Sequence, residues 1–105
     1  MPTPTPFRVD RFVVPQQAMP MFLARLQETQ RRLDELPGCR QNVVLKRAGE
    51  SGDAEVVTIV EWASTEAMQH AKSAMQARYE LEGFDPASFM NSLGVQADMG
   101  TWLPA

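Results

Sequence analysis

Val56-Val57-Thr58-Ile59-Val60-Glu61-Trp62 is the stretch of sequence that decides the fold. Successive side chains of a β-strand point to opposite faces of the sheet. One face of this strand carries Val56, Thr58, Val60 and Trp62, and the other carries Val57 and Ile59. Both faces are mainly apolar, which is typical of a central strand that is covered on both sides. The stretch therefore predicts a sheet with one layer packed against each face.

The length and composition of the chain indicate one globular domain. The chain has 105 residues, of which 44% are hydrophobic and 22% are charged, so a single core of ordinary size is expected. Proline alternates with small residues over positions 1–6, and proline disfavours both helix and strand pairing. We therefore expect a flexible tail at residues 1–6 and a single domain over residues 7–105.

Charge, hydropathy and cysteine content exclude several classes of protein. The formal net charge is −3, with acidic and basic residues interleaved, which leaves no basic patch for nucleic acid. No apolar run approaches the roughly 20 residues that span a bilayer, and the N-terminus lacks the pattern of a signal peptide. Cys39 is the single cysteine, so no internal disulfide can form and a cytoplasmic location is expected.

Hydrophobic periodicity predicts the order βαββαβ, with a small extra helix before the last strand. The strands are expected at 7–14, 40–47, 56–62 and 95–102, and the helices at 17–36, 65–82 and 86–93. Right-handed crossovers and a hairpin between the second and third strands give an α+β fold of the ferredoxin-like type. This fold is a four-stranded antiparallel sheet with its helices on one face.

Charged residues interrupt two of these elements. Arg8, Asp10 and Arg11 dilute the apolar pattern of the first strand, which suggests an edge or a partly exposed position. The first helix is expected to turn a solvated face outward, made of Arg25, Glu28, Arg31, Arg32 and Glu35.

The predicted helices would leave one face of the sheet uncovered. Val57 and Ile59 of the central strand lie on that face, and apolar side chains are normally removed from water. A second copy of the chain is the simplest cover. The sequence therefore predicts a homodimer joined through its sheet faces.

Two short stretches carry a resemblance to a known family. Pro37-Gly38-Cys39-Arg40 precedes a strand, and Glu61-Trp62-Ala63-Ser64-Thr65-Glu66-Ala67 leads from a strand into a helix. With the order and length of the elements from Phe7 to Trp102, they resemble the antibiotic biosynthesis monooxygenase domain. The resemblance implies a dimeric α/β barrel, in which each subunit has a cavity between its own sheet and helices. Characterised members include oxygenases that convert polycyclic phenols to quinones without flavin or metal, and others that degrade haem.

The resemblance also implies roles for Trp62 and His70 as catalytic residues. Oxygenating members place a tryptophan in the pocket at the end of the third strand, although packing beneath the helices is the alternative for Trp62. Many members carry a histidine nine residues later, where this chain has Ala71. His70 lies one position earlier, and one residue along a helix turns a side chain by about 100°. His70 is therefore either a partner of Trp62 or a surface histidine.

Four further polar residues are candidates for binding a substrate, with solvated or capping roles as the alternative. They are Arg40 and Asn42 on the second strand and Arg78 and Tyr79 on the second helix. Haem degradation fits less well, because the first strand has Asp10 where haem-degrading members carry asparagine. One histidine and one cysteine cannot build the usual zinc site, and no nucleotide-binding glycine pattern occurs. No metal or cofactor is therefore expected.

The resemblance predicts a cofactor-independent monooxygenase of a small phenolic or polycyclic aromatic substrate. Such a pocket must exclude water, orient the ring and favour its anion, which passes an electron to O₂. Trp62 would stack on the ring, Arg40 or Arg78 would stabilise the phenolate, and His70 or a water molecule would accept the proton. The alternative is a non-catalytic dimeric module that binds a small ligand or another protein. A packed interface around Trp62 would favour the module, and an open apolar cavity with a few polar groups would favour an enzyme.

Overall fold

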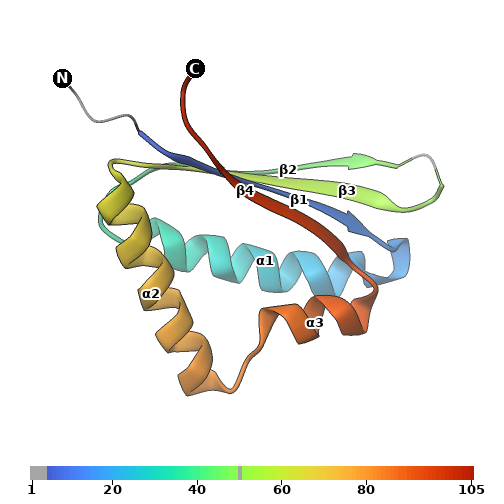
Figure 1. Cartoon of the computed structure of the whole chain (residues 1–105). Coiled ribbons are helices and arrows are strands. Elements are labelled where there is room, and N and C mark those ends of the chain that lie inside the picture. The colour runs from blue at the N-terminus through green and yellow to red at the C-terminus, as the bar shows by residue number, and fades with distance from the viewer. Residues whose placement is uncertain (1–4, 50) are drawn as a thin grey trace.

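The computed structural model describes residues 5–49 and 51–105 and forms one antiparallel sheet with helices on one face (Figure 1). The strands are β1 (Phe7–Val14), β2 (Cys39–Ala48), β3 (Ala54–Trp62) and β4 (Gln96–Trp102). They pair in the order β2-β3-β1-β4, and every pair is antiparallel. The predicted ferredoxin-like α+β fold is confirmed. Within the described residues, no helix is both long enough and apolar enough to cross a membrane.

The predicted N-terminal tail falls mostly outside this range, because residues 1–4 lie outside the described residues. Pro6, the last residue of that segment, is fully buried. Its carbonyl oxygen accepts a hydrogen bond of 2.9 Å from the backbone N–H of Trp62. The chain is therefore attached to the end of β3 before β1 begins.

Capping residues mark the ends of two of the three α-helices, and the first has no side-chain cap. A 3₁₀ turn, η1 (Gln16–Ala18), precedes α1 (Met19–Asp34), so the first helix is shorter at both ends than the expected 17–36. The other helices are α2 (Thr65–Glu82) and α3 (Pro86–Leu93). Ser64 caps α2 by accepting a 3.1 Å hydrogen bond from the N–H of Ala67, and Gly83 ends it with a φ of 64°. That left-handed conformation suits glycine, which has no Cβ.

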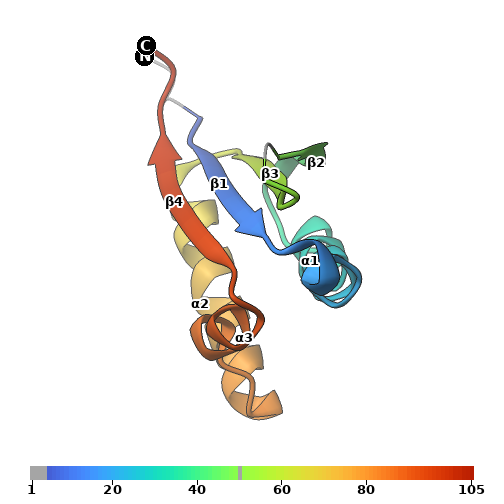
Figure 2. The same cartoon turned by 90° about the vertical axis from the view of Figure 1, so that its right-hand side faces the viewer.

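The helices form one layer beneath the sheet. Figure 2 shows α1 beneath the side of the sheet that carries β2 and β3, and α2 and α3 toward the side that carries β4. The side chains of β3 on this face are buried as predicted, with exposed fractions from 0% at Val56 to 3% at Val60. Two separate clusters make the core. One comprises Phe12, Val14, Ala18, Phe22, Val56 and Val95, and the other comprises Val60, Trp62 and Ala71.

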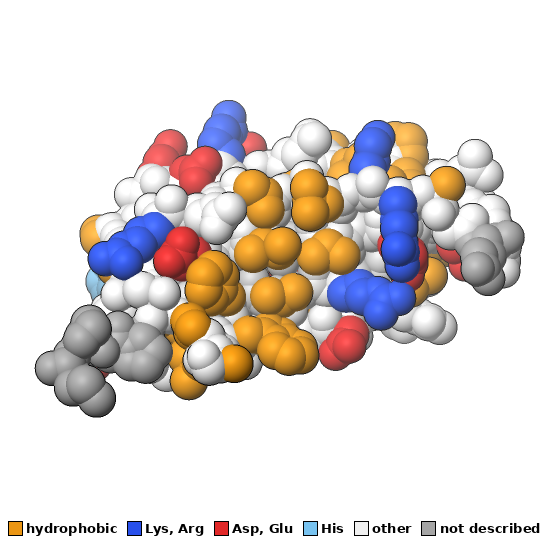
Figure 3. All heavy atoms as spheres, turned by 90° about the horizontal axis from the view of Figure 1, so that it is seen from above, with side chains coloured by type: hydrophobic (Ala, Val, Ile, Leu, Met, Phe, Trp, Pro, Cys, Tyr) orange, Lys and Arg blue, Asp and Glu red, His pale blue; other side chains and the backbone are white. Residues whose placement is uncertain are grey.

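The opposite face of the sheet is uncovered in the single chain, and we call it the open sheet face. Figure 3 shows hydrophobic side chains gathered over its centre, with charged side chains around them. Strand alternation and register place Phe7, Val9, Val13, Val43, Leu45, Val57, Ile59 and Trp102 on this face. Leu45 is 54% exposed and Trp102 is 62% exposed. A monomer would therefore keep a broad apolar surface in water, which is uncommon for a stable soluble chain.

Candidate functional site

A cavity of about 380 Å³ lies between the sheet and the helices α1 and α2. We call it the main chamber. Its volume falls within the range of small-molecule sites, about 300–1,000 Å³. Trp62 and Val60 line one end, and Tyr79 lies on the wall that α2 provides. From the sequence, an open apolar cavity around Trp62 with a few polar groups is expected for an enzyme, and a packed interface there for a non-catalytic module.

A second cavity of about 180 Å³ adjoins the main chamber, and we call it the side chamber. Residues that line the side chamber and not the main chamber include Phe22 and Arg25 of α1, Phe84 of the loop after α2, and Phe89 of α3. The two chambers share the side chains of Asp10, Thr29, Gln30, Leu33, Thr58, Tyr79, Pro86 and Met99. The shared residues make the two chambers neighbours, and together they form an elongated region that extends from Trp62 to the rings beside Arg25.

The register of the strands explains why this space has polar walls. Asp10 of β1 lies opposite Thr58 of β3 on one side and Met99 of β4 on the other. This row crosses the sheet between the two core clusters, on the face that the helices cover. Thr58 is 2% exposed. The sheet therefore presents a carboxylate and a hydroxyl to the cavity, with apolar packing at either end.

Asp10 is the acidic group of the cavity wall. Burial raises the pKa of its carboxyl above the ordinary value of 3.8, although the nearby Arg8 guanidinium and a hydrogen bond from the Gly100 backbone oppose that shift. Arg8 Nη2 donates a hydrogen bond of 3.2 Å to Asp10 Oδ1, and Arg8 also lines the main chamber. A carboxylate with a raised pKa is a stronger base than a solvated one, so Asp10 is suited to accept a proton.

Gln30 brings an amide group from α1 to both chambers, and it is 8% exposed. Its Nε2 donates a 2.7 Å hydrogen bond to Asn42 Oδ1, and its backbone oxygen accepts another of 2.7 Å from Asn42 Nδ2. Asn42 also donates to Asp34 Oδ1 at 3.0 Å. Asn42 is therefore not part of the cavity wall, but it fixes the position of Gln30, which is.

The six candidate residues from the sequence divide into three groups. Trp62 and Tyr79 line the main chamber, and Trp62 is 2% exposed. Asn42 lies behind Gln30. Three others, His70, Arg40 and Arg78, are exposed and absent from the walls of both chambers. The structure thus brings two of the six together at the cavity, and the catalytic and binding roles of all six stay predictions.

Several residues of the cavity wall were missed in the sequence analysis. Arg8 and Asp10 alternate with Phe12 and Val14 on the face of β1 that meets the helices. Charged residues in phase with core residues of a strand could have signalled a polar cavity, whereas the sequence analysis interprets them as signs of an edge or a partly exposed position. The strand is in fact internal, between β3 and β4. Arg8 and Asp10 line the main chamber, with side chains that are 33% and 20% exposed, so the partly exposed position is the alternative that holds.

Two residues that were expected on the solvent-exposed face of α1, Arg25 and Arg32, point toward α2 instead. Arg25 and Arg32 have side chains that are 26% and 14% exposed, and both face the carboxylate of Glu82 on α2. The face that was expected to meet solvent is therefore partly an interface between helices. Across the residues that the structure describes, no three His, Cys, Asp or Glu side chains gather closely enough to hold a metal ion.

The chain is similar in fold to several solved structures. A dimeric ferredoxin-like protein from an uncultured marine organism has a TM-score of 0.73 at 9% identity, over 97% of this chain and 96% of that one. SnoaB from Streptomyces nogalater, a cofactor-independent oxygenase, has a TM-score of 0.61 at 18% identity, over 98% and 95%. A conserved protein from Methanosarcina mazei Go1 has a TM-score of 0.66 at 10% identity, over 95% and 92%. Identities this low establish the fold alone.

Sequence comparison adds a family assignment. A family model described as antibiotic biosynthesis monooxygenase matches residues 8–79. The match extends from β1 to Tyr79 of α2, and thus includes Asp10, Trp62 and most of the main chamber. Curated protein sequences contain no match to the chain.

Proposed function

Because the chain belongs to the antibiotic biosynthesis monooxygenase family, we propose that it is a cofactor-independent monooxygenase of a small phenolic or polycyclic aromatic substrate. The observation that carries the proposal is the main chamber, where a buried tryptophan and a carboxylate of raised pKa line the same space. Trp62 offers an aromatic surface and one N–H donor. Asp10 offers a base.

The reaction needs few groups from the protein. The substrate ring lies against Trp62, and Asp10 accepts a proton from the acidic carbon or hydroxyl. Arg8, which lines the chamber beside Asp10, stabilises the resulting anion by charge. The anion passes an electron to O₂, and the two radicals combine to form a carbon–oxygen bond. At an anthrone-type carbon, one oxygen atom replaces the two hydrogens as a carbonyl and the other leaves as water.

The cavity supports this assignment over a purely packed interface. An aromatic ring system fits a space of about 380 Å³, and a sheltered site strengthens electrostatic interactions with the developing anion. A non-catalytic ligand-binding role draws on the same cavity. The two roles differ in one measurable respect, since only the enzyme consumes oxygen when a phenolic ligand binds.

A homodimer joined through the open sheet faces is part of the proposal. The support is the apolar surface around Val57 and Ile59, together with the dimeric state of the ferredoxin-like protein of similar fold. Two such surfaces placed face to face remove apolar area from water on both copies. The chambers lie on the other side of the sheet and stay open in this assembly.

Oxygen uptake tests the proposed activity. Purified protein is incubated with a panel of anthrone-type and naphthol-type substrates, and uptake is followed with an oxygen electrode. We expect Asp10→Asn to reduce the rate by about 10²–10⁴-fold, the range for a lost general base. Asp98→Asn is the matched control, because Asp98 is an exposed aspartate on β4 that faces away from the helices. No uptake over the whole panel would overturn the proposal in favour of ligand binding alone.

Trp62→Phe separates the role of the indole from that of the carboxylate. The variant keeps an aromatic ring and loses the N–H donor, so we expect a higher KM and a moderate loss of rate. Trp102→Phe is the matched control, since Trp102 is the other tryptophan and lies on the open sheet face, on the opposite side of the sheet from the chambers. An unchanged KM and rate in Trp62→Phe would remove this residue from the site.

A further inference from the structure

Arg25 is the one cationic side chain on the wall of the side chamber, among the described residues. Its guanidinium carbon lies 3.5 Å from the ring centroid of Phe84 and 5.8 Å from that of Tyr79. The stacked rings fix the guanidinium at the inner end of the cavity by cation–π attraction. Arg25 lines only the side chamber and Trp62 lines only the main chamber, so the two residues lie at opposite ends of the two chambers.

Two nitrogens of this guanidinium lack hydrogen-bond partners. Nε and Nη2 are both shielded from solvent, and neither donates to an acceptor within the described part of the chain. Nη2 lies 3.7 Å from Glu82 Oε1, which is beyond hydrogen-bond distance. Buried charged donors are normally paired, because an unpaired one loses its hydration without compensation. Arg25 therefore lines the side chamber with a charge that no hydrogen-bonded carboxylate among the described residues balances.

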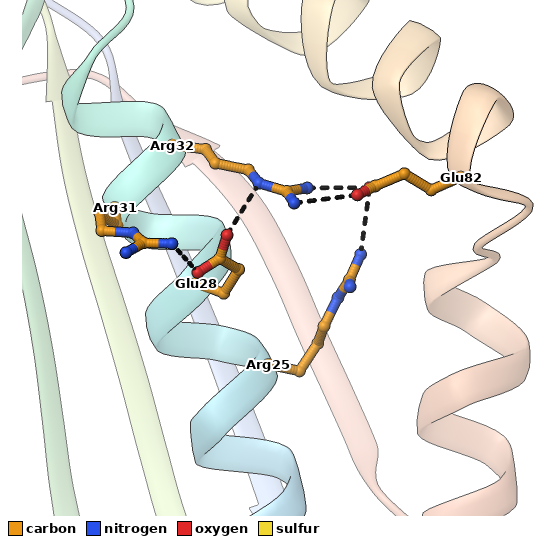
Figure 4. Close-up of polar contacts among 5 residues, drawn as sticks. All are labelled: Arg25, Glu28, Arg31, Arg32 and Glu82. Carbon is orange, nitrogen blue, oxygen red and sulfur yellow. Dashed lines mark hydrogen bonds and ion pairs between the residues drawn. The ribbon is translucent and has the colours of Figure 1, made fainter.

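Glu82 is already committed to another arginine (Figure 4). Arg32 donates from Nη1 and Nη2 to the two carboxylate oxygens of Glu82, at 2.9 Å each. This two-bond geometry is the strong form of an arginine–carboxylate pair, and Arg32 lowers the pKa of the Glu82 carboxyl. Glu82 therefore balances the charge of Arg32 before that of Arg25.

Among the described residues, Arg25 is the cation of the cluster in Figure 4 that has no hydrogen-bonded carboxylate. Arg31 donates to Glu28, and Arg32 donates to Glu28 and Glu82. The charge of Arg25 is therefore the one left to attract an anion. Asp10 is the acidic group on the shared wall, and it is paired with Arg8. Because Arg8 balances the charge of Asp10, the Asp10 carboxylate repels an anion bound at Arg25 less strongly than an unpaired carboxylate would.

We propose that Arg25 binds an anionic oxygen of the substrate, a carboxylate or an ionised phenol, at the end of the cavity remote from Trp62. That the bound anion is a substrate rests on the proposed function, and the site itself rests on the incompletely paired charge of Arg25 on the wall of the side chamber. An acidic aromatic compound would lie with its ring system in the main chamber and its anionic oxygen in the side chamber. The substrate class is then an acidic aromatic compound, and neutral hydrocarbons of the same shape bind more weakly.

Calorimetric titration with two isosteric ligands tests the subsite without any reaction. Naphthalene-2-carboxylate and naphthalene-2-carboxamide differ in charge and little in shape. We expect the wild-type protein to bind the carboxylate about tenfold or more tightly, as a charge-assisted hydrogen bond allows. Arg25→Gln should abolish that preference, and Arg25→Lys should keep part of it. Equal affinities in the wild type, or a preference that persists in Arg25→Gln, would overturn the proposal.

Arg31→Gln is the matched control, because Arg31 lies on the same helix and its loss changes the net charge equally. Its side chain is 69% exposed and is not on the wall of either chamber. We expect this variant to keep the preference for the carboxylate ligand. If it loses that preference, the preference comes from the net charge of the protein and not from a subsite at Arg25. Thermal unfolding of each variant verifies the fold. Because binding is measured without O₂ turnover, a protein that prefers the carboxylate and consumes no oxygen supports the subsite and refutes the monooxygenase.

Discussion

Gln30 of α1 and Asn42 of β2 are joined by two hydrogen bonds of 2.7 Å each, one to a side-chain oxygen and one to a backbone oxygen. Gln30 is 8% exposed and lines both chambers. The pair therefore attaches the helix that forms one cavity wall to β2, an edge strand of the sheet. Loss of this pair should therefore lower the stability of the fold and also change the position of the cavity wall that α1 provides.

Asn42→Ala is expected to leave the amide of Gln30 without its partner. An unsatisfied buried polar group costs about 1–3 kcal/mol, and we expect a loss of that order in the free energy of unfolding. Urea denaturation measures it. Gln41→Ala is the control, because Gln41 is an exposed neighbour on β2. Equal losses in the two variants would mean that Gln30 finds another partner and that the pair does not fix α1.

The pH dependence of stability tests the environment of Asp10. Its folded pKa lies above the ordinary 3.8, so the folded chain holds this proton more tightly than the unfolded chain does. The stabilisation that the proton gives is complete below the ordinary pKa, and it is lost as the pH rises through the folded pKa. Asp10→Asn lacks this titration. We therefore expect the wild type to lose stability relative to the variant as the pH rises from about 4.

Chemical denaturation at a series of pH values from about 3.5 to 7 measures that difference. The wild-type free energy of unfolding minus that of Asp10→Asn should fall over this interval and then level off. A difference that instead grows with pH would mean that the pairing with Arg8 outweighs burial. The pKa of Asp10 would then be depressed, and the carboxylate would be a weaker base than the proposed reaction needs.

The elements could be predicted from the sequence because their signals are local. Alternation from Val56 to Trp62 and the caps of α2 at Ser64 and Gly83 need only neighbouring residues, and the structure has the strand and the helix where they were expected. The cavity could not be predicted in the same way. The roles of Asp10 and Arg25 depend on which strand lies beside β1 and on where the end of α2 meets α1, and both are contacts between distant parts of the chain.

Ile59→Lys tests the homodimer. Ile59 lies on β3, at the centre of the open sheet face, and a charge buried between two sheets has no partner to offset its lost hydration. We expect sedimentation equilibrium at micromolar concentration to show a dimer for the wild type and a monomer for the variant. Leu81→Lys is the control, because Leu81 is an apolar residue of α2 that is 90% exposed. A wild type that sediments as a stable monomer would contradict the assembly.

Gly38→Ala tests how closely α2 must approach the turn before β2. Gly38 has a φ of +87°, and a Cβ added there would lie 2.7 Å from the Cβ of Ala67 on α2. Its carbonyl oxygen also accepts a 2.7 Å hydrogen bond from the N–H of Ala63. The substitution therefore combines left-handed backbone strain, which costs about 1–3 kcal/mol, with a contact too short for two methyl groups.

Gly52→Ala separates the two effects, because Gly52 has a φ of +83° and a Cβ added there would meet no described atom within 4 Å. We expect both variants to lose stability in urea denaturation and Gly38→Ala to lose more. The difference between the two losses in the free energy of unfolding measures the cost of moving the start of α2. Ala67 packs beside the cluster of Val60, Trp62 and Ala71, so displacing it should also alter the main chamber and raise KM for the aromatic substrate. Equal losses in the two variants, with KM unchanged, would mean that α2 shifts freely and that the close approach at Gly38 does not shape the site.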